Sequence, residues 1–190
     1  MNILIDKLPT EYEGLKINTN FRSFILFELL MQDRTISTKQ QIAVALGLFY
    51  EGEVFDTKEK IEKAMKGILW FYTLGYKNQK KKSESKAKKR YNDIYSYEYD
   101  AEYIYSAFLS QYRLDLNEVD YLHWWKFKSL FDGLNEENQI CKIMSYRAID
   151  LSKIKDEEQK KHYRDLKRDF ALPDNRTEEE KEEDFANALW

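Results

Sequence analysis

Residues Tyr97 to Leu134 read YEYDAEYIYSAFLSQYRLDLNEVDYLHWWKFKSLFDGL, and aromatic residues are far denser here than in the rest of the chain. Aromatic side chains each bury a large area and supply much of the energy of a core or an interface. Between Tyr97 and Tyr112 the apolar residues repeat at helical spacing. The segment from Tyr121 to Leu134 is apolar over much of a helix circumference, which is typical of a central helix. We therefore predict a core built on Ile104, Phe108, Trp124, Phe127 and Phe131.

Length and composition favour one helical domain. A chain of 190 residues is one domain by the usual size range and can bury a core without a disulfide or a metal. Only 2 Pro and 6 Gly are present, which disfavours a turn-rich β fold. We expect a mainly α fold: a single helical domain of about six to eight helices with a short N-terminal β-hairpin.

Charge and cysteine content restrict the environment and the partners. The net charge of -3 provides no overall field for nucleic acid or acidic lipid. The single Cys141 excludes an internal disulfide and suits a reducing compartment. The N-terminus has no signal-peptide pattern, and no apolar run approaches the roughly 20 residues that cross a bilayer. A cytosolic protein without a membrane partner is expected.

Local patterns place the expected elements along the chain. Ile3 and Ile5 alternate with polar residues, as do Leu15 and Ile17, which predicts a hairpin across a turn from Pro9 to Gly14. Capping and periodicity predict helices from Asn18 or Thr19 to Asp33, from Ser37 or Thr38 to near Gly52, after a cap at Asp56, after Asn135, and from Asp156 to Phe170.

The chain divides into four segments by composition. Residues 1–76 hold the hairpin and three helices, 77–90 form a basic linker, 91–172 form the aromatic-rich core that packs on the first part, and 173–190 form an acidic arm. The linker, KNQKKKSESKAKKR, cannot bury itself, so a solvated connection is the default interpretation. The alternative is a nucleic-acid-binding accessory protein that contacts phosphates through Lys80, Lys81, Lys82, Lys88, Lys89 and Arg90.

The acidic arm ends in apolar residues. Phe185, Leu189 and Trp190 share one face of a short amphipathic helix if that segment is helical. Such a helix either docks on its own body or a sister subunit, or enters the groove of another chain. These three residues are the candidate partner-binding set.

The sequence contains few residues, and no spacings, that are typical of a catalytic or metal-binding site. His123 and His162 are the only histidines, and no spacing typical of a zinc site or a phosphate-binding loop occurs. His123 precedes two Trp, which favours a hydrogen-bonded core or boundary histidine over a catalytic base. Cys141, beside Ile140 and Ile143, reads as a buried small hydrophobe. We predict no catalytic, cofactor-binding or metal-ligating residue, no cofactor and no enzymatic activity.

Several stretches resemble a known family. They are DAEYIYSAFLSQYRLDL from Asp100 to Leu116, LHWWKFKSLFDGL from Leu122 to Leu134 and MSYRAIDL from Met144 to Leu151, with LPTEYEG…INTNFRSF and YRDLKRDFALP towards the two ends. Together they resemble the bacteriophage family called gene product fifteen, found in siphophages and prophages of Gram-positive bacteria. The Leu-His-Trp-Trp-Lys-Phe segment is the most specific part of the resemblance.

The resemblance implies a tail assembly chaperone. Such a protein would coat the long helical tape measure protein and assist polymerisation of the tail tube protein around it. It would act in the host bacterial cytoplasm and be absent from the mature virion. Its partners would be the tape measure, possibly the tail tube protein, and possibly a second copy of itself. A tape measure exposes much apolar helical surface, so an aromatic-rich helical protein with adhesive segments is physically suited to sheathing it.

Overall fold

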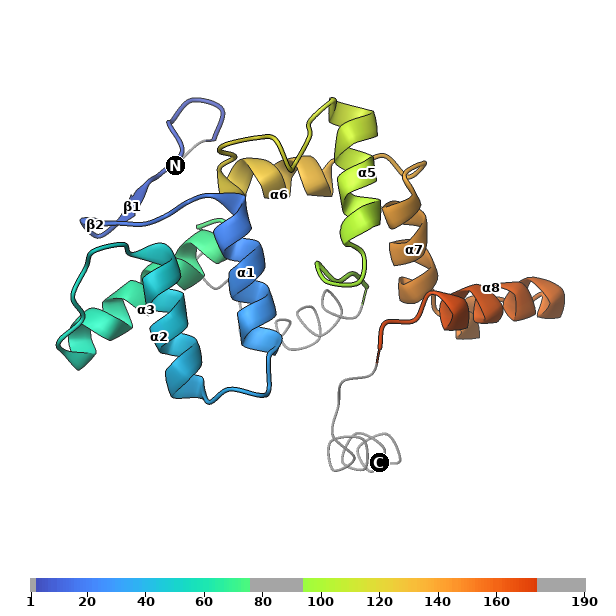
Figure 1. Cartoon of the computed structure of the whole chain (residues 1–190). Helices are drawn as coiled ribbons and strands as arrows, with labels where there is room; N and C mark the ends of the chain where they lie inside the picture. The colour runs from blue at the N-terminus through green and yellow to red at the C-terminus, as the bar shows by residue number, and fades with distance from the viewer. Residues whose placement is uncertain (1–2, 76–93, 174–190) are drawn as a thin grey trace.

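The computed structural model describes residues 3–75 and 94–173 (Figure 1). In these ranges the chain forms seven α-helices, one short 3-10 helix and a two-stranded antiparallel hairpin, which confirms the predicted mainly α fold. The elements are β1 (Glu11–Tyr12), β2 (Leu15–Lys16), α1 (Phe21–Gln32), α2 (Thr38–Phe49), α3 (Lys58–Tyr72), α5 (Ala101–Tyr112), α6 (Trp124–Asp132), α7 (Gln139–Ala148), η1 (Leu151–Lys153) and α8 (Glu157–Asp169). Within the same ranges, no helix combines the length and the apolar character that spanning a membrane requires.

The N-terminal hairpin is shorter than predicted, and it starts later in the chain. Its turn is made by Glu13 and Gly14, with φ of 48° and 82°, and this places Tyr12 opposite Leu15. Two consecutive positive φ values are typical of the tightest hairpin turns, and the turn fixes the register of the strands. The prediction that Ile3 and Ile5 form the first strand is therefore wrong, and both side chains are exposed.

Helix starts follow capping chemistry, although three caps differ from the prediction. The cap of α1 is Asn20, whose side chain accepts the N–H of Arg22, and not Asn18 or Thr19. Ser37, one of the two predicted starts, is the N-cap of α2 and forms a complete capping box with Gln40. The cap of α3 is Thr57 and not Asp56, because the Thr57 hydroxyl accepts the N–H of Lys60, while the Asp56 carboxylate pairs with the Lys60 ammonium at 2.8 Å. Helix α7 likewise begins after Asn138, three residues later than the predicted cap at Asn135.

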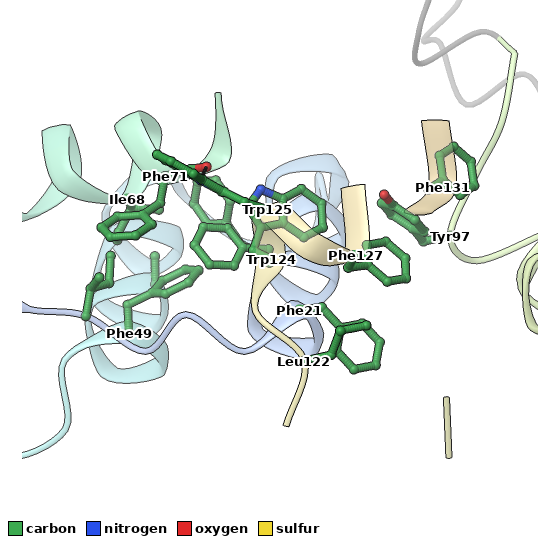
Figure 2. Packing of buried hydrophobic residues seen from close by; sticks show 14 of the residues in the cluster. Phe21, Phe49, Ile68, Phe71, Tyr97, Leu122, Trp124, Trp125, Phe127 and Phe131 are labelled. Atoms are coloured by element: carbon green, nitrogen blue, oxygen red, sulfur yellow. Dashed lines mark hydrogen bonds between the residues drawn. The ribbon is translucent and has the colours of Figure 1, made fainter. Parts of the chain in front are cut away.

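The core is a continuous aromatic layer centred on α6 (Figure 2). The Trp124 ring stacks on Phe24 of α1 at 5.1 Å and on Phe127 at 5.7 Å, and Phe127 stacks on Phe108 of α5 at 5.0 Å. Figure 2 shows this layer continuing towards Tyr97 and Phe131. All five residues proposed as the core from the sequence are buried: Ile104, Phe108, Trp124, Phe127 and Phe131. The layer joins the two halves of the chain across α1, α3, α5 and α6.

A buried ion pair fixes the start of α5 to the last two helices. Helix α5 begins at Ala101 and not at Tyr97, so the segment before it is irregular. The Arg147 guanidinium of α7 donates to both carboxylate oxygens of Asp100, at 2.6 and 2.9 Å, and to the carbonyls of Ile94 and Phe170. Both side chains of the pair are almost fully buried. One arginine thus joins the 94–100 segment, α7 and the end of α8.

Two helical glycines should respond in opposite ways to substitution by Ala. A Cβ at Gly67 in α3 would lie 2.6 Å from the Tyr50 hydroxyl and 3.3 Å from Tyr12 Cβ, whereas a Cβ at Gly47 in α2 would meet nothing within 4 Å. Gly67→Ala is expected to lower the free energy of unfolding by about 1–3 kcal/mol, because Tyr50 must give up its bond to the Ala64 carbonyl. Gly47→Ala should instead raise it by up to about 1 kcal/mol.

Urea denaturation of the two variants beside the wild type measures both effects. Equal changes of the same sign would contradict the close approach of the hairpin to α3.

Candidate functional site

An apolar groove of about 430 Å³ opens between α1 and α5. Its third wall is the loop after α5, and Phe127 of α6 adds to its lining. The lining residues are Phe21, Arg22, Ile25, Tyr97, Ala101, Glu102, Ile104, Tyr105, Leu116, Asn117 and Phe127. A volume of this size lies in the usual range for ligand-binding clefts.

The groove is an outward continuation of the aromatic core. Phe21, Ile104 and Phe127 are buried, and the Phe21 and Phe127 rings stack at 4.9 Å. Ile25 is half-buried and Ala101 is exposed, so apolar surface extends from the interior to solvent. Contiguous apolar surface of this kind commonly marks a site for a protein or an apolar ligand.

Two polar side chains of the groove, those of Arg22 and Tyr105, are already used to hold its wall. The Arg22 guanidinium donates to the backbone carbonyls of Leu116 at 2.7 Å, Val119 at 2.8 Å and Asn117 at 3.3 Å. The Tyr105 hydroxyl donates to Asp115 at 2.9 Å. Arg22 and Tyr105 therefore fix the loop after α5, and the groove presents mainly carbon to an occupant.

A second polar cluster lies in the interior. Glu28 of α1 is buried and accepts a hydrogen bond of 2.8 Å from the Tyr72 hydroxyl. Burial raises the pKa of Glu28, and the Tyr72 bond and the charge of Lys128 only partly oppose this shift. Burial beside Glu28 also raises the pKa of Tyr72. Because Glu28 and Tyr72 are not part of the groove lining, we assign the cluster to the connection between α1 and α3.

His123 is the N-cap of α6. The backbone N–H of Trp125 donates to His123 Nδ1 at 3.1 Å, so the ring proton lies on Nε2, which donates to the Pro9 carbonyl at 2.9 Å. Both ring nitrogens are therefore engaged, and the ring is neutral in the folded chain. Burial lowers the pKa of His123, and the bond to Pro9 opposes this shift. The sequence indicated a hydrogen-bonded histidine here but not its capping role.

The lowered pKa of His123 predicts a pH dependence of stability. The unfolded chain takes up a proton near the ordinary pKa of 6.5, whereas the folded chain resists it. Between about pH 7.5 and 5.5 the free energy of unfolding should therefore fall as the pH falls. His123→Asn keeps a capping side chain and should remove this part of the slope. Chemical denaturation at several pH values measures it, with His162→Gln on α8 as the matched control; an unchanged slope in His123→Asn would contradict the assignment.

Cys141 and the acidic residues form no reactive arrangement. Cys141 is half-buried and not fully buried as predicted, and its thiol donates weakly to the Leu134 carbonyl at 3.8 Å. Burial raises the pKa of Cys141, which keeps the thiol protonated and weakly nucleophilic. Across residues 3–75 and 94–173, His, Cys, Asp and Glu side chains nowhere gather in threes in a way that could hold a metal ion.

The binding residues proposed from the sequence lie outside the described residues. This applies to the partner-binding set Phe185, Leu189 and Trp190, and to the basic set Lys80, Lys81, Lys82, Lys88, Lys89 and Arg90. Both assignments stay predictions. Sequence reasoning missed the groove, because its walls come from α1, from α5 and from the loop after α5. The contact of Arg22 with Leu116, 94 positions later, leaves no local pattern.

Comparison with known proteins identifies the family. The family model described as bacteriophage Gp15 protein matches residues 4–172, which includes all three groove walls. The curated proteins contain no match to the chain, and neither do the solved structures. The match covers most of the chain and confirms the family resemblance seen in the sequence. The chain belongs to the family of bacteriophage Gp15 proteins.

Proposed function

We propose that this phage protein is a tail assembly chaperone that binds the helical tape measure protein and assists polymerisation of the tail tube protein. The observation that carries the proposal is the apolar groove between α1 and α5, in a chain that belongs to a bacteriophage family. An amphipathic helix docks in such a groove through side chains spaced three or four residues apart. A tape measure protein would offer many such helical segments along its length.

The groove suits recognition that tolerates many sequences. Its lining is mostly aliphatic and aromatic, and Arg22 and Tyr105 are bonded within the protein. A partner is therefore held mainly by apolar burial, at roughly 25 cal/mol per Å² of apolar surface removed from water. Successive helical segments of one long partner can then use the same kind of groove on successive copies of the chaperone. Sheathing of this kind keeps an aggregation-prone helix apart from its neighbours.

The proposed activity is binding without turnover. His123 uses both ring nitrogens in structural bonds, and Cys141 is held as a thiol beside a backbone carbonyl. Neither side chain is placed as a base or a nucleophile towards the groove. We propose further that the protein acts in the host bacterial cytoplasm during tail assembly and is absent from the finished virion.

Coexpression with the tape measure of the same phage tests the proposal. The long protein should stay in the supernatant and copurify with the wild-type chain. Ala101→Trp places a bulky ring at an exposed groove position and should reduce copurification at least tenfold. Ser106→Trp, at an exposed position of α5 outside the groove lining, is the matched control.

Two results would count against the proposal. One is a tape measure that aggregates equally with and without the wild-type chain. The other is equal capture by Ala101→Trp and the wild type, which would move the binding site away from the groove. Thermal unfolding of both Trp variants separates lost binding from lost folding.

A further inference from the structure

We propose that the groove between α1 and α5 is occupied by the C-terminal apolar residues of the same chain, Phe185, Leu189 and Trp190. This occupancy does not depend on the chaperone activity. It follows from where the described chain ends, how far the following residues reach, and what the groove accepts.

The described chain leaves α8 close to the start of α5, whose first residue lines the groove. The Phe170 carbonyl accepts a hydrogen bond of 2.6 Å from Arg147, and the same guanidinium binds Asp100 at 2.6 Å. Asp100 directly precedes Ala101, which lines the groove. Figure 1 shows the segment after α8 running past the α7 end that faces the start of α5. Two side chains, Arg147 and Asp100, thus connect Phe170 to the residue that precedes the groove residue Ala101.

The remaining chain is long enough and has the right chemistry. Residues 174–184 lie between Pro173 and Phe185, and an extended segment of this length spans about 36 Å. The segment from Glu178 to Asp184 is almost entirely acidic, so it cannot enter an apolar groove without losing its hydration. Phe185, Leu189 and Trp190 follow it at a spacing that brings them to one face of a helix. The acidic run then acts as a solvated spacer, and the apolar residues as the anchor.

The groove fits this anchor better than it fits a polar ligand. Arg22 already donates to three carbonyls and Tyr105 donates to Asp115, so neither is left to recognise a charged or sugar-like group. Ile25, Ala101 and Leu116 offer carbon surface, and apolar contact is what Phe, Leu and Trp side chains provide. If the groove also receives a tape measure helix, the anchor competes with it. That consequence rests on the proposed function, whereas the occupancy itself does not.

Paramagnetic relaxation in the isolated full-length protein tests the occupancy. A nitroxide is attached to Asn187→Cys, whose sequence spacing from Phe185, Leu189 and Trp190 would put it outside their face of a helix, in a Cys141→Ser background. The methyl signals of Ile25 and Ile104 should lose most of their intensity, whereas those of Ile61 in the first turn of α3 should be retained. Ala101→Trp should restore the two groove signals, and Ser106→Trp should not.

Mixed samples identify which chain supplies the anchor. Spin-labelled protein without isotopes is mixed with isotope-labelled protein that carries no nitroxide. The proposal is supported if the groove signals are lost only when one chain carries both the nitroxide and the isotopes. Loss of equal size in the mixed sample would assign the anchor to a second copy and overturn the proposal. Groove signals no more attenuated than those of Ile61 would also overturn it. Because no tape measure is present, these outcomes are independent of the coexpression result.

Discussion

Replacing Arg147 with Ala is expected to lower the free energy of unfolding by about 3–5 kcal/mol, the range for breaking one side of a buried ion pair. The loss leaves the Asp100 carboxylate buried without its counter-charge, although Ser96 N–H still donates to it at 2.9 Å. It also leaves the carbonyls of Ile94 and Phe170 without the donor that joins them. Urea denaturation followed by far-ultraviolet circular dichroism measures the change.

Matched variants separate the buried pair from an ordinary surface pair. Arg168→Ala removes a guanidinium that is 70% exposed and bonded to Asp165 and Asp169, so it should cost no more than about 1 kcal/mol. Arg147→Lys keeps the charge but cannot form the two-pronged contact, and it should fall between these values. Combining Arg147→Met with Asp100→Leu should cost less than Arg147→Ala alone, because no charge is then left buried. Equal losses in Arg147→Ala and Arg168→Ala would contradict the importance of the buried pair.

The helices that could be predicted from the sequence are those whose ends are set by local chemistry. The capping box of Ser37 and Gln40 and the cap at Asp156 are complete within four residues of chain, so the starts of α2 and α8 are readable. The start of α5 is not. Tyr97 fits the apolar spacing of that helix, but the Arg147 contact with Asp100 and Ile94 holds the preceding segment in an irregular path. A contact from 47 positions away decides the boundary.

The difference between local chemistry and distant contacts also explains why the groove and the capping role of His123 could not be predicted from the sequence. Density of aromatic residues predicts which side chains are buried, since burial of Trp124 or Phe127 is favoured in any helical packing. It does not predict which apolar residues remain accessible once α1 and α5 have packed. Ile25 and Ala101 show no unusual local pattern, and only the loop held by Arg22 makes them part of a groove. The capping role of His123 depends similarly on Pro9, 114 positions earlier.

Trp124→Ala is the second substitution for which a loss of about 3–5 kcal/mol is expected, the range for truncating a fully buried large aromatic side chain. Trp124 is 1% exposed and stacks between Phe24 and Tyr72, with ring centroids at 5.1 and 5.9 Å. Its indole N–H also donates to the Tyr72 carbonyl at 3.3 Å. Removing the ring therefore leaves a cavity where α1, α3 and α6 meet. Denaturant unfolding measures the loss.

Two further variants make the Trp124 result decisive even if Trp124→Ala does not fold. Trp124→Phe keeps a ring for stacking and loses the indole N–H and part of the volume, so its loss should be clearly smaller. Tyr99→Ala removes a ring that is 48% exposed, and it should change stability by no more than about 0.5 kcal/mol. If Trp124→Ala changed the free energy of unfolding as little as Tyr99→Ala does, the aromatic layer would not stabilise the interior, and its rings would instead be available for binding at a surface. The groove between α1 and α5 would then lose its rigid floor, because Phe127 stacks on Trp124 in the same layer.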